Sequence, residues 1–200
     1  MLQHLRPAIV LLLGFSLLTG IVYPFAVTGL AQFLLPYQAN GSLIARDGSV
    51  VGSALIGQNF TAEKYFHSRP SATSEPDPKD ATKSIAVPYA ADNSAGSNLG
   101  PTAKALIDRV KDDTAKLRAE NPNVPVPGDL VTTSASGLDP DISPAGADFQ
   151  VPRVARARGM AEDAVRALVA AHTAARFLGV FGAPRVNVLA LNLALDAAAK

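Results

Sequence analysis

The 200-residue sequence contains no cysteine, only three histidines and no large excess of either charge. Without cysteine the chain can form no disulfide, carries no lipoprotein acceptor and lacks thiolate zinc ligands. The histidines, at positions 4, 67 and 172, are too scattered for zinc-type spacing. The formal net charge is +1 with mixed signs, so the chain has no basic footprint for nucleic acid.

Charge is also absent from Pro7 to Ala45, and the strongly apolar part of this stretch is Ala8–Leu35. About 20 apolar residues in an α-helix cross a bilayer core of roughly 30 Å, and this run is longer. It has no polar stripe of the kind found on amphipathic surface helices. We therefore predict a cytoplasmic N-terminus and transmembrane helix within residues 1–36. Pro7 should lie in the first turn, and a kink or helix end should occur near Pro24.

A buried core helix and a cleaved signal peptide are the other interpretations of this segment. Signal peptides have an apolar stretch of about 7–15 residues followed by small residues, whereas here the stretch is about twice as long. The best small-residue site, near Ala39, lies well beyond it. A retained anchor is therefore favoured. Arg6 and His4 precede the span, and Arg46 is the first charge after it, so we expect the N-terminus inside and the main domain outside.

The predicted anchor has one face of small residues. Ser16 and Gly20 are four positions apart, a spacing that lets two membrane helices approach closely. We expect this face to contact a partner helix.

Residues 37–200 are predicted to form one extracytoplasmic α+β domain, because helical and strand patterns occur without regular alternation. An Asp-Gly pair at 47–48 between apolar runs predicts a hairpin. The polar segment near 71–95 is expected to be a long mobile loop. The remaining expected elements are a helix from Pro101 to Asn121 with an Asp112–Lys116 pair on its exposed side, a strand at 130–132, a helix at 144–158 capped by Ser143 and ended by Gly159, a helix at 161–177 and a buried strand at 186–195.

A catalytic or metal site is hard to assemble from these residues. Ser134 or Ser136 could join Asp139 and His172 in a triad, but neither serine lies in a G-x-S-x-G elbow. Asp139, Asp141 and Ser143 begin like a calcium loop, yet Pro144 and Gln150 occupy its glycine and glutamate positions. The arginines at 153, 156 and 158 are interpreted as a solvated face. We predict no catalytic, cofactor or metal residue. An extracytoplasmic enzyme using Ser136, and a ligand-binding module using the helix start at Pro101, remain alternatives.

Several short segments of the chain occur in the order in which one known family has them. They are Gln38–Ser42, Leu55–Gln58, Tyr65–Ala72, Gly96–Pro101, Asp129–Thr132, Ser136–Pro140, Arg153–Ala155 and Arg185–Leu189. Together they are similar to the C chains (KdpC family) of the Kdp-type potassium-transporting ATPase, a bacterial importer. The chain departs from the usual family pattern at Ala95, Ala135, Asp141 and Ala190.

The resemblance implies a non-catalytic subunit of a high-affinity, ATP-driven potassium importer in the inner (cytoplasmic) cell membrane. Its implied partners are a channel-like potassium-binding chain, a P-type ATP-hydrolysing chain and a small membrane chain. The family roles are a catalytic chaperone that raises the ATP affinity of the pump chain, with ATP the one ligand implied, and a cap near the external potassium entrance. Because an outer domain cannot meet cytoplasmic ATP, the expected topology favours the cap. Arg69 and Asn98 lie in family motifs on predicted loops, so they are expected to contact partners, with an ion pair for Arg69 or a helix cap for Asn98 as the structural alternative.

Overall fold

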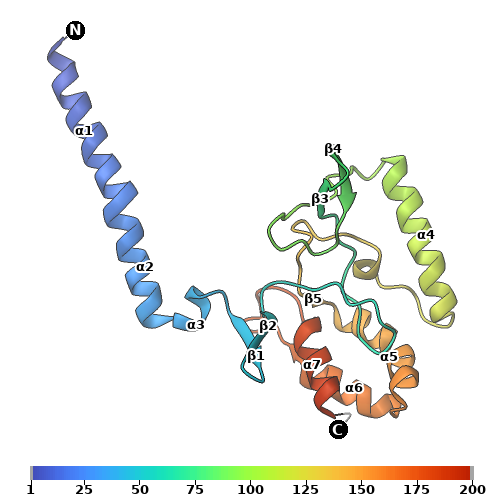
Figure 1. Cartoon of the computed structure of the whole chain (residues 1–200). Helices are drawn as coiled ribbons and strands as arrows, with labels where there is room; N and C mark the ends of the chain where they lie inside the picture. The colour runs from blue at the N-terminus through green and yellow to red at the C-terminus, as the bar shows by residue number, and fades with distance from the viewer. Residues whose placement is uncertain (1, 199–200) are drawn as a thin grey trace. The chain divides into compact units, whose positions relative to one another are not determined.

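The computed structural model describes residues 2–198 and divides into two compact units, 1–53 and 54–200 (Figure 1). Each unit is described by itself below. The class is mixed helix and sheet, as the sequence predicts.

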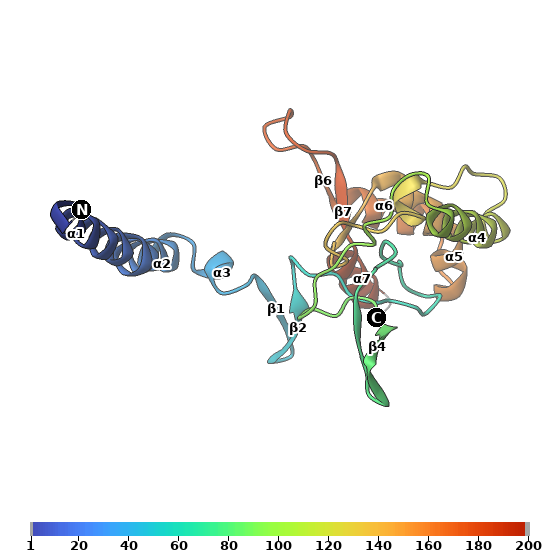
Figure 2. The same ribbon diagram turned by 90° about the horizontal axis from the view of Figure 1, so that it is seen from above.

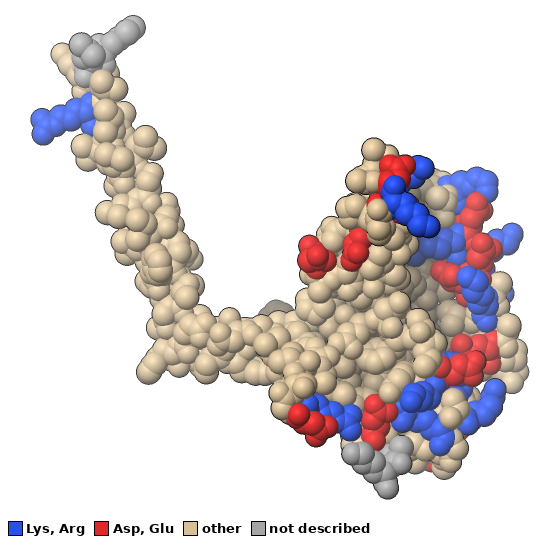
Figure 3. Space-filling model, in the orientation of Figure 1, with Lys and Arg blue, Asp and Glu red and all other residues tan. Residues whose placement is uncertain are grey.

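The first unit consists mainly of one long apolar helix. After the 3₁₀ turn η1 (Leu2–His4), α1 (Leu5–Leu17), the π-helical turn η2 (Leu18–Val22) and α2 (Tyr23–Leu34) follow without interruption. Leu5–Leu34 is 30 residues long, none of its most apolar window is buried, and it is the one helix in the described part of the chain that could span a membrane. Figure 3 shows this helix almost entirely without charged atoms.

Pro24 does not end the helix. It lies at the second position of α2, directly after the π-helical turn η2. Proline has no N–H to donate to the preceding turn, and a π-turn is one way in which a helix adjusts around such a break. The helix end expected near Pro24 does not occur; the helix continues, with a π-helical turn just before α2.

The predicted hairpin after the long helix is confirmed. A short helix, α3 (Pro36–Ala39), leads into β1 (Leu43–Arg46), which pairs antiparallel with β2 (Ser49–Ser53). Asp47 and Gly48, between the strands, have φ values of 52° and 79°. Left-handed conformations at both central residues define the tight hairpin turn that Asp-Gly favours.

The core of the second unit lies among three helices and a small sheet. The helices are α5 (Pro144–Arg158), α6 (Glu162–Ala171) and α7 (Val188–Ala198). The sheet is antiparallel with the order β5-β7-β6, formed by Asp141–Ile142, Arg185–Asn187 and Thr173–Ala174 respectively. The buried side chains of this core include Phe66, Phe149, Ile142, Val165, Val186, Leu191 and Leu195.

The helix α5 begins and ends as its sequence predicts. The Ser143 hydroxyl accepts a hydrogen bond from the Gly146 N–H (2.9 Å), and Asp129 holds Ser143 in turn by accepting from its N–H (2.7 Å). Gly159 ends the helix in the left-handed conformation, with φ 64°. A capping residue at the start of a helix and a glycine at its end are both local signals, so they can be predicted without knowledge of the tertiary structure.

The C-terminal third differs from the sequence prediction. The strand expected at 186–195 ends at Asn187, and Val188–Ala198 is the helix α7. The Asn187 side chain accepts a hydrogen bond from the Ala190 N–H (2.9 Å), which starts this helix. The helix expected at 161–177 ends at Ala171, because Thr173 and Ala174 pair with β7 instead.

Two further expectations are wrong. Gly128–Leu130 is a 3₁₀ turn, η3, in place of the strand expected at 130–132, and Thr132 bonds back to the Gly128 carbonyl oxygen (2.8 Å). The segment expected to be a long loop contains the hairpin β3 (Ser74–Asp77) and β4 (Asp80–Ala86). Most of β4 is exposed on both faces, so it lacks the alternation by which strands are predicted.

The helix α4 (Lys104–Glu120) ends at Asn121 as predicted but starts after Ala103 rather than at Pro101. None of its residues is fully buried, and Ile107, expected on the inner face, is 52% exposed. Leu117 does pack against the core. Lys116 pairs with Asp113 (3.4 Å) instead of the expected Asp112. Arg109, Asp113, Lys116, Leu117 and Glu120 of α4 line the pocket described next.

Candidate functional site

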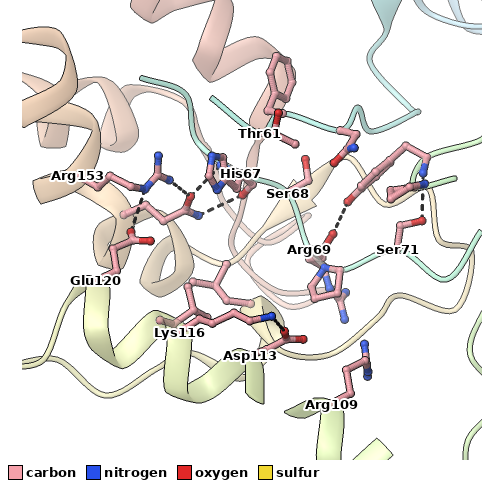
Figure 4. Close-up of a pocket in the computed structure, with 18 residues that line it drawn as sticks. Thr61, His67, Ser68, Arg69, Ser71, Arg109, Asp113, Lys116, Glu120 and Arg153 are labelled. Atoms are coloured by element: carbon pink, nitrogen blue, oxygen red, sulfur yellow. Dashed lines mark hydrogen bonds and ion pairs between the residues drawn. The ribbon is translucent and has the colours of Figure 1, made fainter. Parts of the chain in front are cut away.

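A pocket of about 580 Å³ lies between α4, α5 and the segment from Asn59 to Ser71 (Figure 4). Its walls combine apolar side chains with an unusual number of charged ones. The charged and titratable residues lining it are His67, Arg69, Arg109, Asp113, Lys116, Glu120 and Arg153, and the apolar and aromatic ones are Phe60, Pro70, Pro88, Tyr89, Leu117 and Leu130.

Two buried amide side chains hold one wall of the pocket. Asn192, on α7, accepts from the Phe66 N–H (2.9 Å) and donates to the Phe66 carbonyl oxygen (3.0 Å). Gln150, on α5, does the same for His67, with distances of 2.8 and 3.1 Å. A side-chain amide offers one acceptor and two donors, so it can satisfy an extended backbone as a neighbouring strand would. This segment is thereby fixed against the core.

Arg153 ties this wall to α4. Its guanidinium donates to Glu120 (2.9 Å), to Gln150 (2.8 Å) and to the carbonyl oxygens of Glu63 and Tyr65, and its side chain is only 8% exposed. Burial lowers the pKa of His67, and the nearby Arg153 charge lowers it further. His67 is therefore neutral at physiological pH and adds no positive charge to the pocket.

Arg69 lies on the opposite side of the pocket in an ion pair with Asp139 (2.8 Å). Its backbone carbonyl oxygen accepts from the Tyr89 hydroxyl (2.8 Å), and burial raises the pKa of Tyr89 to about 12. The pairing of Arg69 with a carboxylate, the structural alternative of the sequence analysis, is thus confirmed. The Nε of Arg69 is buried and has no hydrogen-bond partner among the described residues.

Arg109 projects from α4 into the pocket. Its Nε and one terminal nitrogen are buried and find no hydrogen-bond acceptor in the part of the chain that the structure describes. Each acidic residue that lines the pocket is paired with another base, Asp113 with Lys116 and Glu120 with Arg153. Arg109 is the lining base for which no ion pair is found among residues 2–198.

The serine triad considered from the sequence does not assemble. The Ser136 hydroxyl accepts from the Leu138 N–H (3.1 Å), a turn contact, and Asp139 is held by Arg69. His172 bonds through Nδ1 to the Leu168 carbonyl oxygen (2.9 Å) at the end of α6. Among the described residues, no group of three metal-binding side chains occurs.

The four residues predicted to contact partners lie in different places. Arg69 lines the pocket, whereas Asn98 lies exposed in the loop before α4 and does not line it. Asn98 is not the cap of α4, because the cap position is Ala103, without a side-chain hydrogen bond. Ser16 and Gly20 lie on the long helix of the other unit, and nothing comes within 4 Å of a Cβ built on Gly20.

Sequence reasoning missed the most buried bases of the second unit. The arginines at 153 and 158, interpreted from the sequence as part of a solvated face, have side chains that are 8% and 6% exposed. Arg158 pairs with Asp196 (2.9 Å) and stacks on Tyr65, and Arg156 alone of the three is exposed. A signal existed at Arg153, which lies between the apolar Val151 and Val154 on the inner side of a helix.

An exposed apolar loop connects β6 to β7. Phe177, Leu178, Val180 and Phe181, here called the apolar tip, are 69%, 75%, 71% and 64% exposed. The backbones of Phe177 and Phe181 bond to each other twice, each at 2.9 Å, so the loop has a defined shape. Figure 2 shows it projecting beyond β6 and β7. Clusters of this kind on a soluble surface mark contacts with a partner or a membrane.

These features define a class: a domain with no assembled catalytic centre among its described residues, joined to a candidate membrane helix and carrying surfaces suited to partners. The family model "K+-transporting ATPase, c chain" matches residues 5–197. This chain therefore belongs to the KdpC family, and it is a non-catalytic, membrane-associated subunit of a potassium-transporting ATPase. The resemblance found in the sequence is confirmed.

Curated relatives agree over the whole chain. A protein of Rhodopseudomonas palustris (strain BisB18) named potassium-transporting ATPase KdpC subunit is 68% identical, covering 99% of this chain and 100% of the relative. Proteins of the same name from Bradyrhizobium diazoefficiens and Methylorubrum extorquens are 66% and 64% identical, over 100% of this chain and 99% and 100% of their own lengths.

Proposed function

We propose that this subunit acts outside the membrane, as a domain of residues 37–200 held by one helix and working through surfaces that it offers to the other chains of the importer. The observation that carries the proposal is the uncovered apolar surface: the helix Leu5–Leu34 in one unit and the apolar tip in the other. Isolated soluble domains seldom expose such groups, whereas subunits of complexes do.

The orientation rests on charge. Arg6 and His4 flank the helix on its short N-terminal side, and no charged residue occurs from there until Arg46 and Asp47. Basic residues favour the cytoplasmic side of a span, which supports an orientation with the N-terminus inside and the second unit outside the inner membrane.

A reporter that is active only outside the cytoplasm, fused after Lys200, should therefore be active. A cytoplasm-only reporter at the same position is the matched control and should be silent. Activity of the cytoplasmic reporter would overturn both the orientation and the external role.

With the domain outside, direct contact with cytoplasmic ATP is impossible. We therefore favour a cap near the external potassium entrance of the channel-like chain over a direct nucleotide contact. The family role of raising the ATP affinity of the P-type chain would then act through the helix, as coupling between two sites. Ser16 and Gly20 provide the face for close packing on a helix of another chain, such as the channel-like chain or the small membrane chain, and Asn98 is the more accessible of the two loop candidates.

The double substitution Phe177→Ser/Phe181→Ser should lower the recovery of this subunit with the purified complex by about tenfold or more, because large buried aromatics dominate protein interfaces. The backbone bonds of the loop remain, so the fold should be retained. Ile107→Ser/Val124→Ser, at apolar side chains that are 52% and 43% exposed but lie outside the tip, is the matched control. Equal recovery of both variants would exclude the tip as a subunit contact.

A further inference from the structure

We infer that the pocket beside α4 binds a compact oxyanion, a small organic carboxylate or inorganic phosphate, through the guanidinium of Arg109. The site does not include the Ser16–Gly20 helix face, Asn98 or the apolar tip of the proposed function, and it shares only Arg69 with the partner-contact candidates.

The first support is the unsatisfied state of Arg109. Two of its guanidinium nitrogens, Nε and one terminal nitrogen, are buried without a partner among the described residues. An arginine stays charged at every physiological pH, and a buried charged donor without an acceptor is costly. Nε and a neighbouring terminal nitrogen form the fork that binds two oxygens of a carboxylate or phosphate. An oxyanion in the pocket would satisfy both once the Arg109 side chain turns, because neither nitrogen is open to solvent in this structure.

The second support is the arrangement of the other charges. Arg69, Arg109, Lys116 and Arg153 line the pocket against Asp113 and Glu120. Asp139, which does not line the pocket, compensates Arg69, so with His67 neutral one positive charge is in excess, that of Arg109. Asp113 lies one turn from Arg109 on α4, yet it pairs with Lys116. In Figure 4 the Arg109 side chain extends toward Arg69, and no dashed line reaches it.

Arg69 strengthens the site. Its terminal nitrogens are directed to Asp139 (2.8 Å) and, at 3.5 Å, to Thr132 and Thr133, while its buried Nε has no partner in the described chain. Asp139 offsets the charge of Arg69, whereas no carboxylate among the described residues offsets that of Arg109. Both arginines line this pocket, and together they carry three buried nitrogens without a partner in the described chain, two on Arg109 and one on Arg69.

The size of the cavity limits the ligand class. About 580 Å³ accommodates a small organic acid, and Phe60, Leu117 and Leu130 supply apolar wall beside the bases. Inorganic phosphate would fit with several waters. The small organic acid and inorganic phosphate present the same feature to the pocket, a compact group of charged oxygens.

The test is titration of the full-length chain in detergent with inorganic phosphate and, separately, with citrate. Ionic strength is held constant with chloride, so that screening does not imitate binding. Calorimetry gives the affinity, and the arginine Nε–H signals in NMR spectra identify the side chains that bind. Saturable binding of either anion with a shift of the Arg109 signal is expected, and the tighter anion defines the ligand class.

Arg109→Gln should weaken that affinity by about tenfold or more, the loss expected for a charged fork. Arg118→Gln, on the exposed last turn of the same helix, is the matched control and should change it less than about twofold. Arg109→Lys keeps the charge but lacks the fork, so its anion affinity should fall between those of Arg109→Gln and Arg118→Gln. This variant keeps the proposal testable if the glutamine variant does not fold. Absence of saturable binding up to about 10 mM of both anions, or equal affinity of Arg109→Gln and the wild type, would overturn the inference. The inference would also be overturned if Arg109→Gln is no longer recovered with the complex while its anion binding is unchanged. In that case an acidic side chain of a partner chain would be the group that pairs with Arg109 in the pocket.

Discussion

Cells that lack this subunit should grow normally in potassium-rich medium and fail when external potassium becomes scarce. Because this chain is a non-catalytic subunit of a potassium-transporting ATPase, its removal should disable the complex rather than abolish a separate reaction. We expect the potassium concentration for half-maximal growth to rise by about tenfold or more, equivalent to about 1.4 kcal/mol of lost affinity for potassium. Growth curves over a series of potassium concentrations measure it.

Complementation of the deletion strain provides the control for this experiment. A plasmid carrying the intact chain should restore growth, and one carrying Ser136→Ala should restore it equally, because the Ser136 hydroxyl serves the turn at Leu138. The purified chain alone should hydrolyse no ATP. Unchanged growth of the deletion strain at low potassium would contradict the role in import, and failure of a folded, assembled Ser136→Ala chain would revive an enzymatic role.

Arg153→Ala should lower the free energy of unfolding of the second unit by about 3 kcal/mol or more. Its guanidinium joins Glu120 on α4, Gln150 on α5 and the carbonyl oxygens of Glu63 and Tyr65. Removing one member of a buried ion pair leaves the others without compensation, which typically costs about 3–5 kcal/mol. Because Glu120 is 26% exposed, water can recover part of its loss, so the lower end of that range applies.

Urea unfolding followed by circular dichroism measures this loss. Arg156→Ala is the matched control on the same helix, at an exposed position, and should change stability by less than about 0.5 kcal/mol. Hydrogen exchange of the α5 amides provides a second measurement if the alanine variant is too unstable for a full urea curve. A loss below about 1 kcal/mol for Arg153→Ala would show that this network contributes little net stability.

Local signals account for the elements that the sequence predicts well. The uncharged stretch predicts the long helix, Asp47-Gly48 the hairpin, and Ser143 with Gly159 the two ends of α5. Each of these depends on residues next to one another in the chain. The solvent preference of an apolar run, the φ angles of a turn and a capping hydrogen bond need no distant partner.

The errors occur where distant segments decide the outcome. Val188–Leu195 is apolar enough for a buried strand or a buried helix, and periodicity does not separate the two in short runs. In the folded chain, β7 ends once it has paired with β5 and β6, and Asn187 starts α7. The helix after Glu162 is likewise shortened by pairing of Thr173–Ala174 with β7. These pairings join residues that lie far apart in the sequence.

The pocket also combines features that the sequence predicts with features that depend on distant segments. From the sequence alone, Arg69 is a plausible contact residue because it lies in a family motif on a predicted loop, and the family assignment itself comes from the sequence. The sequence by itself thus determined the long apolar helix, the mixed helix-and-sheet class and the family, since these depend on composition and local order. Only the tertiary structure decided that Arg153 is buried, that Arg69 pairs with Asp139, and that Arg109 lines a pocket without a partner among the described residues. The physical reason is that burial and ion pairing depend on which side chains arrive from other elements, and the spacing of residues along one element does not contain that information.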